Sequence, residues 1–234
     1  QTCGAEVFRV EDTLARMGKA YGVERMNVFV ITSSIVITME LKDGRELTQT
    51  RRVRKAGGND FTRLECLNVL SREYCEDPFP AGELGRRLAQ IRKIRIPRRE
   101  RYVGNILAAS SFAVFFGGGW KDALISGIFA VAISLLQDYV ELICMNTMVF
   151  NVIASFLTGI GIRLICRLVP GLDMDMIMIG DIMLLIPGLM STNAIRDVLI
   201  GDTLSGIIRL IAALLLAAAL ALGFMGAIIL FGRF

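Results

Sequence analysis

The stretch LSGIIRLIAALLLAAALALGFMGAIILF, residues 204–231, decides the fold class of this chain. Arg209 is its one charged residue, and the stretch is longer than the roughly 20 apolar residues that cross the hydrocarbon core of a bilayer as a helix. Further apolar stretches of comparable length follow one another from Gly104 onward. The sequence therefore predicts an α-helical integral membrane protein rather than a single soluble globular domain.

Working back from this stretch, the apolar segments predict about five transmembrane helices. They are expected at about residues 102–118, 123–140, 148–169, 176–200 and 204–231. Small residues recur at every fourth position in the first and the last of them: Ala109, Ala113 and Gly117, and Ala213, Ala217 and Ala221. Small side chains let helix backbones approach each other closely in lipid, so we expect these rows at helix contacts.

Charged residues are concentrated before the first predicted span. Residues 1–101 hold 20 of the 26 Lys and Arg residues and 14 of the 22 Asp and Glu residues, so this part carries a net +6 and the remainder a net −2. Eight basic residues fall between Arg86 and Arg101, with Glu100 as the one acid among them. Short basic flanks of a membrane span stay in the cytoplasm. We therefore expect a cytoplasmic N-terminal domain; a nucleic-acid site is disfavoured because a membrane segment follows directly.

Residues 1–98 are expected to form a small α+β domain that ends in a basic juxtamembrane helix, and residues 99–234 the transmembrane domain. Apolar periodicity predicts helices at about residues 5–20, 60–74 and 80–95. A short apolar run at 26–32 and an alternating strand at 35–41 come between the first two helices, and Asp43-Gly44 predicts a hairpin turn into a strand at 46–53. A glycine-containing loop is expected at 55–59.

Several chemistries are disfavoured by composition. The chain contains no His, which excludes a His-ligated metal and a Ser-His-Asp triad, and none of its five cysteines form a CxxC pair. The acidic residues of the N-terminal domain show no spacing that prescribes a reaction, and Gly57-Gly58 alone is too weak a signal for a phosphate loop. We expect no enzyme activity, no metal and no cofactor.

The fourth predicted span carries the most polar sequence, GDIMLLIPGLMSTNAIRD at residues 180–197. An ionisable residue in hydrocarbon is costly, so Asp181 should face protein or water. Pro187 and Gly188 should break the helix, and a broken helix exposes the backbone groups from which transporters build binding sites. Polar side chains that can gather near this break follow it: Ser191, Thr192, Asn193, Arg196 and Asp197. The alternative is a simple kink with an interfacial charge pair.

Polar and small residues also recur at every fourth position in the second predicted span: Asp122, Ser126, Ala130, Ser134 and Asp138. Such a row is explained either by helix packing with two interfacial carboxylates or by the wall of a polar pathway. The arginines of the third and fifth predicted spans are Arg163, Arg167 and Arg209. They either neutralise Asp181 or attract an anion, or their side chains extend to a membrane interface.

The chain resembles the threonine/serine exporter family, in particular its shorter two-component type. The residues that carry the resemblance are Phe8-Arg9-Val10-Glu11, Tyr21-Gly22, Phe116-Gly117-Gly118, Pro187-Gly188, Asn193-Ala194-Ile195-Arg196-Asp197, Gly201-Asp202 and Ser205-Gly206. The resemblance implies a multi-pass protein of the bacterial cytoplasmic (inner) membrane. It implies that the protein works with a second membrane subunit, assembles as a homo-oligomer, or both. It also implies export of small hydrophilic metabolites, threonine and serine or, in some two-component members, dicarboxylates such as succinate.

The resemblance further implies energy from the proton motive force. Without His, proton coupling must fall to carboxylates, and the candidates are Asp181, Asp138 and Asp197. The expected substrate site lies at the helix break and consists of Pro187, Gly188, Ser191, Thr192, Asn193 and Arg196. In an alternating-access mechanism the substrate carboxylate would meet Arg196 or a helix N-terminus. A passive channel and a membrane-anchored scaffold or sensor remain as alternatives.

Overall fold

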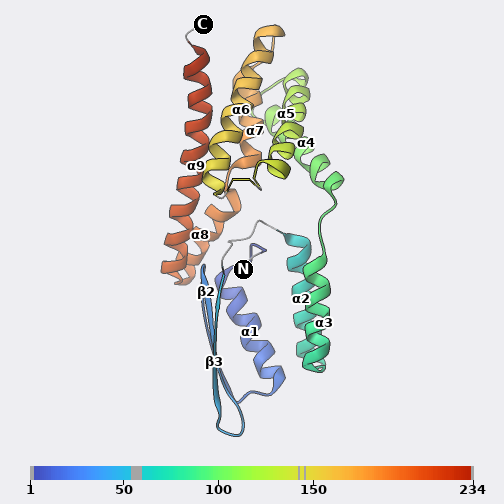
Figure 1. The fold of residues 1–234 in the computed structure, drawn as a ribbon, viewed down its shortest axis with the longest axis vertical. Helices are drawn as coiled ribbons and strands as arrows, with labels where there is room; N and C mark the ends of the chain where they lie inside the picture. Colours follow the sequence, from blue (N-terminus) through green and yellow to red (C-terminus); the bar gives the residue numbers. More distant parts are fainter. Residues whose placement is uncertain (1–2, 54–59, 142, 145, 233–234) are drawn as a thin grey trace. The chain divides into compact units, whose positions relative to one another are not determined.

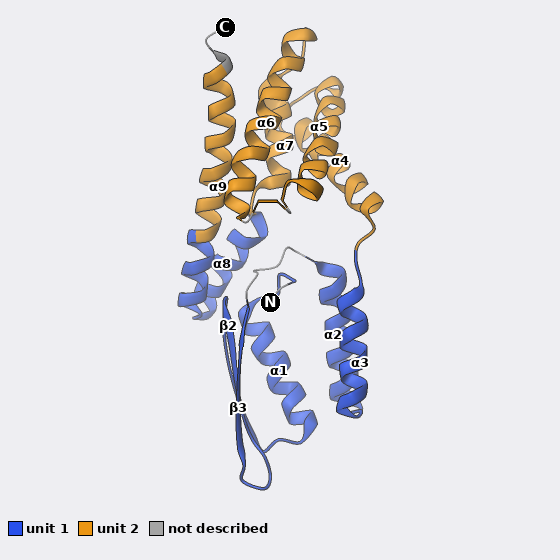
Figure 2. Cartoon of the chain, viewed as in Figure 1, with its two compact units in different colours: residues 1–95, 188–211 blue, residues 96–187, 212–234 orange. Residues whose placement is uncertain are grey.

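The chain folds into two compact units that do not follow the linear order of the sequence. The structure, a computed structural model, describes residues 3–53, 60–141, 143–144 and 146–232. The first unit combines residues 1–95 with 188–211, and the second combines residues 96–187 with 212–234 (Figure 2). The first unit therefore contains the expected α+β segment together with the second half of the broken fourth span.

The sheet of the first unit is a three-stranded antiparallel meander. It consists of β1 (Arg25–Ile31), β2 (Ser34–Glu40) and β3 (Glu46–Arg52), with β2 in the centre. Ile37 of β2 lies opposite Val28 of β1 and Gln49 of β3. Gly44 adopts a φ of 78°, as the turn between β2 and β3 requires. The hairpin expected at Asp43-Gly44 is confirmed.

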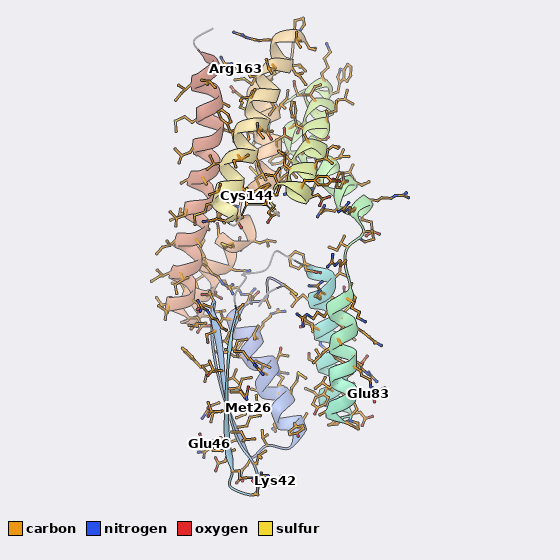
Figure 3. All side chains as sticks on the ribbon, in the orientation of Figure 1. Met26, Lys42, Glu46, Glu83, Cys144 and Arg163 are labelled. Carbon is orange, nitrogen blue, oxygen red and sulfur yellow. The ribbon has the colours of Figure 1, made fainter. Side chains whose placement is uncertain are left out.

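Helix α1 (Val7–Tyr21) packs on one face of this sheet. A Cβ at Gly18 would overlap the Sδ atom of Met26, which extends from β1 (Figure 3), so the absence of a side chain lets helix and strand approach. The Glu11 carboxylate accepts a hydrogen bond of 2.8 Å from the backbone N–H of Val30 in the same strand. The helix ends at Gly22, whose φ of 91° permits the left-handed cap.

Helices α2 (Phe61–Glu76) and α3 (Ala81–Lys93) lie side by side (Figure 1). Asp60 caps α2 by accepting a hydrogen bond of 2.9 Å from the Arg63 backbone N–H. Arg87 of α3 joins the two helices through Glu73, at 3.0 Å. Both helices confirm the prediction, whereas the loop expected at residues 55–59 lies outside the described residues.

The first unit is completed by α8 (Gly188–Ile200) and the beginning of α9 (Thr203–Gly232). Gly201 makes the turn between them with a φ of 105°. A Cβ at Gly206 would lie 2.7 Å from the carbonyl oxygen of Ala194, so this glycine allows the two helices to pack backbone to backbone.

In the second unit all regular secondary structure of the described residues is α-helical. The unit consists of α4 (Arg98–Phe115), α5 (Trp120–Tyr139), α6 (Thr147–Leu168), α7 (Met174–Leu185) and the remainder of α9. One of its apolar clusters joins α5, α6, α7 and α9 through Phe129, Ile162, Ile177, Met178 and Phe224.

The small-residue row of α4 is confirmed at the contact between α4 and α7. Ala109 and Ala113 are fully buried, and a Cβ at Gly180 of α7 would lie 2.7 Å from the Ala109 carbonyl oxygen. Gly117, the third expected member, comes after the end of α4 and is exposed.

The row expected in α9 is wrong in its spacing. Ala221 is exposed, and the buried face instead includes Ala213, Leu220 and Ala227, each seven residues apart. Steps of four rotate about 40° away from a face at roughly 100° per residue, whereas steps of seven drift only about 20°. A row of three residues spaced four apart therefore rotates out of the helix contact, whereas a row of three spaced seven apart stays in it.

Three helices among the described residues are long and apolar enough to cross a membrane: α5, α6 and α9. The pair α7 and α8 supplies a fourth span if the two helices, which are bent at a short break, are taken together. The break at Pro187 confirms the prediction. Helix α4 coincides with the first expected span, but it begins in the basic cluster at Arg98, so its membrane insertion stays a prediction.

We predict that Gly180→Ala destabilises the second unit. The added methyl group would meet the Ala109 backbone and the Ser126 hydroxyl, each at 2.7 Å, and overpacking of this kind costs about 1 to 3 kcal/mol. Gly104→Ala in α4 is the matched control, because it meets nothing within 4 Å and replaces a helical glycine. Thermal unfolding in detergent should give a lower Tm for the first variant and an unchanged or higher Tm for the second; equal Tm values would contradict the close contact.

Candidate functional site

Helix α8 presents two different polar faces within the first unit. Thr192, Asn193 and Arg196 lie at helical spacing on one face and line a cavity. Asp197 is one residue further, which turns it by about 100° onto the face that packs on α9. Asp197 is buried there, beside Arg209. The helix thus separates an open polar face from a buried ion pair.

The cavity is formed by α8, α1, α2 and the segment that leads into α1. Its volume is about 540 Å³, which falls in the range of sites for small molecules. Its charged residues are Glu6, Arg9 and Arg196, with a formal sum of +1. Its hydroxyl and amide groups come from Thr13, Asn68, Thr192 and Asn193, and its apolar side chains are Val10, Leu14, Phe61, Leu64, Leu67 and Leu189.

The charged groups of the cavity lie within reach of one another. Arg196 Nη1 is 2.7 Å from Glu6 Oε1, and Arg9 Nε is 3.7 Å from Glu6 Oε2. Asn193 Nδ2 donates to the carbonyl oxygen of Gly4 at 3.4 Å. Because two guanidinium groups share a single carboxylate, the site has positive charge to offer to a small anion.

The residues expected at the helix break are only partly brought together. Thr192, Asn193 and Arg196 line the cavity, whereas Pro187, Gly188 and Ser191 are not among the described residues that line it. The Thr192 hydroxyl donates to the Gly188 carbonyl oxygen at 3.1 Å, and so satisfies one backbone group of the first turn of α8. The break itself thus positions the site without forming its wall.

The buried ion pair behind the cavity joins α8 to α9. Arg209 Nη1 lies 3.3 Å from Asp197 Oδ2, and the Arg209 and Asp197 side chains are 14% and 1% exposed. Arg209 Nη2 also donates to the carbonyl oxygen of Ala5 at 3.3 Å. Arg209 therefore pairs with Asp197 instead of neutralising Asp181.

Asp181 is fully buried in the second unit, on α7. The Ser126 hydroxyl of α5 donates to Asp181 Oδ1 at 3.2 Å, while Asp181 Oδ2 has no hydrogen-bond partner among the described residues. No Lys or Arg of the described chain forms a salt bridge with this carboxylate within 4.0 Å. A buried carboxylate without a cationic partner is unfavourable unless it binds a proton or a cation.

Asp138 has a different environment at the end of α5. Its carboxylate pairs with Arg101 of α4, lies 3.7 Å from Arg98 Nε and accepts a hydrogen bond of 3.0 Å from the Tyr102 hydroxyl. The basic cluster at the start of α4 therefore serves in part to hold α5.

The polar row of α5 takes part in contacts between helices of the second unit. Asp122 accepts hydrogen bonds from the backbone N–H groups of Gly119 and Asp173, at 2.7 and 2.8 Å. Ser134 accepts from the Asn105 side chain of α4 at 2.9 Å and donates to Ala130. Each polar residue of the row has a partner within the unit, as the packing interpretation requires.

Two charged cavity residues, Glu6 and Arg9, were not predicted as site residues. Arg9 belongs to the Phe8-Arg9-Val10-Glu11 motif, which pointed to the family but not to this position. Glu6 lies outside every motif, and its partner is 190 residues away in the chain. The motif containing Arg9 is the signal that could have led to the cavity.

Several helices long and apolar enough to cross a membrane, with one span broken, define a multi-pass membrane protein. The model of the family described as "Putative threonine/serine exporter" matches residues 1–231. The chain belongs to this family.

Curated relatives match over nearly the whole chain. The chain is 26% identical to the "Probable succinate transporter subunit YjjP" of Klebsiella aerogenes over 98% of this chain and 88% of the relative. It is 27% identical to the protein of the same name from Escherichia coli K12, over 98% of this chain and 89% of the relative. No solved structure gives a significant match.

Proposed function

We propose that the protein exports small hydrophilic metabolites that carry a carboxylate, with threonine- and serine-type amino acids as the first candidates. The observation that carries the proposal is the cavity in which Arg196, Asn193 and Thr192 of α8 face Glu6 and Arg9. A guanidinium group binds a carboxylate through two parallel hydrogen bonds, and the amide and hydroxyl groups suit a small polar side chain.

A dicarboxylate of the succinate type is the second candidate. It is favoured by the printed name of the two relatives and by the presence of two arginines in the cavity. The first candidate is preferred because Glu6 already neutralises one of the two cations. A second substrate carboxylate would have to bind beside the Glu6 carboxylate, and like charges at close range repel.

Binding and export measurements test this proposal. The purified protein should bind labelled serine or threonine more tightly than labelled succinate, and inverted vesicles should accumulate the bound compound. Tighter binding of succinate would assign the protein to the second candidate. Failure to bind any of the three compounds would overturn the proposal.

The relatives are named transporter subunits, and we propose that this chain likewise works with a second membrane subunit, with copies of itself, or with both. We place it in the bacterial cytoplasmic membrane with the α+β segment in the cytoplasm, because the basic cluster between Arg86 and Arg101 favours that side. Uptake with and without the co-expressed partner, and reporter fusions to the N-terminal segment, check these two statements.

For proton coupling we assign the first role to Asp181. Asp138 and Asp197 are both paired with arginines, whereas Asp181 is buried and forms no salt bridge with a Lys or Arg of the described residues. A carboxyl group that alternates between protonated and ionised forms could carry one proton per transport cycle in an alternating-access mechanism.

We therefore predict that Asp181→Asn uncouples transport. The amide has nearly the same volume as the carboxyl group but cannot release a proton, so accumulation against a gradient should stop while exchange of substrate across the membrane continues. Asp175→Asn, at the first turn of the same helix, is the matched control and should leave accumulation unchanged. Wild-type flux that is insensitive to an uncoupler would instead indicate a passive channel.

A further inference from the structure

The segment that leads into α1 is bound by the polar side chains of α8 and α9. Asn193 binds the carbonyl oxygen of Gly4, Arg209 binds that of Ala5, and Arg196 pairs with the Glu6 carboxylate. Three successive residues of the segment are thus each held by a different side chain. Two of these side chains, Asn193 and Arg196, belong to the proposed substrate site.

Glu6 is held in an incompletely satisfied state. Its side chain is 15% exposed, and Oε1 is 2.7 Å from Arg196 Nη1. Oε2 is buried, accepts no hydrogen bond from the described residues and lies 3.7 Å from Arg9 Nε. A buried carboxylate oxygen without a hydrogen bond is unfavourable relative to a hydrated one, so the segment is bound less firmly than its number of contacts implies.

We propose that the segment Gly4–Glu6 occludes the transport site and that the substrate carboxylate displaces Glu6 from Arg196. The inference rests on the proposed function and adds a gate to it. The side chain of Glu6 presents to Arg196 the same chemical group that the substrate would present. When one carboxylate is bound to Arg196, the paired N–H donors of the guanidinium group are not available to the other carboxylate.

The covalent link makes this competition sensitive to substrate concentration. A group on the same chain, close to its binding partner, competes at an effective concentration on the order of millimolar. The site should therefore stay occluded while the metabolite is scarce and open when it accumulates, which suits export of an excess.

Removing the charge of Glu6 tests the competition directly. In Glu6→Gln the amide keeps the size of the side chain but binds a guanidinium group weakly, so labelled serine, threonine or succinate should bind roughly threefold more tightly. Asp12→Asn is the matched control: it removes an acid of α1 that pairs with Arg16, and Asp12 is not among the described residues that line the cavity.

Cys3 supplies a second readout, because it is a buried free cysteine adjacent to the segment. In a full-length variant whose other four cysteines are replaced by serine, a maleimide should react with Cys3 faster when the substrate is added. The acceleration should saturate at the same concentration as binding. Glu6→Gln should raise the reaction rate even without substrate.

The outcomes separate the gate from the proposed function. The gate is wrong, and the proposed function stands, if three results are found together. Ligand binding depends on Arg196, Glu6→Gln leaves the affinity unchanged, and the reaction rate of Cys3 does not respond to ligand. Absence of binding of all three compounds to both wild type and Glu6→Gln would overturn both. Tighter binding together with ligand-dependent exposure of Cys3 supports the gate.

Discussion

Export is expected to stop when Arg196 is replaced by alanine, although the variant should still fold and insert. Arg196 lines the cavity and is half exposed, so its removal leaves no buried charge apart from Glu6, which keeps Arg9 as a neighbour. Loss of a charge-assisted hydrogen bond to the substrate costs about 1.5 to 3 kcal/mol, or about 10- to 150-fold in Kd. Asn193→Ala should have a smaller effect in the same direction.

The measurement is equilibrium binding and vesicle uptake, with membrane insertion and Tm recorded for each variant. Arg196→Lys keeps the charge but loses the planar fork, so it should restore binding only in part. Lys121→Ala, a cation exposed at the start of α5, is the control for a nonspecific effect of net charge. Wild-type export by a correctly inserted Arg196→Ala variant would remove this cavity from consideration.

Hydropathy and periodicity predicted most of the fold because they reflect what a helix or strand must bury. The apolar stretches at 123–140, 148–169 and 204–231 correspond to α5, α6 and α9, since a chain in lipid must satisfy its backbone groups within each helix. Pro187 placed the helix break correctly because it lacks an N–H group. Helix α4 stays ambiguous, because four charged residues open an otherwise apolar helix.

The site was predictable only along a single helix. Spacing of three and four along α8 predicted Asn193, Arg196 and Asp197 near one place, but Asp197 pairs instead with Arg209 of α9. The partners Gly4 and Glu6 lie about 190 residues earlier, and no local pattern relates two segments so distant in sequence. Their pairing with α8 follows from the packing of the first unit, which periodicity does not specify.

The buried pair of Asp197 and Arg209 is expected to be the most important single contact for the stability of the first unit. Removing one partner of a buried ion pair leaves the other charge uncompensated, which costs about 3 to 5 kcal/mol. That is a large part of the roughly 5 to 15 kcal/mol that stabilises a typical domain. Both Asp197→Ala and Arg209→Ala should therefore unfold at markedly lower temperature than wild type.

The double variant distinguishes this pair from two independent contributions. Once both charges are absent, neither is left unpaired, so Asp197→Ala with Arg209→Ala should lose less stability than the sum of the two single variants. Arg163→Ala is the control, because this arginine of α6 donates to the Ile228 carbonyl oxygen at 3.3 Å from an exposed position and should change the Tm little. Strict additivity of the two single losses would show that the charges do not interact, and Arg209 would then act through the Ala5 carbonyl oxygen alone.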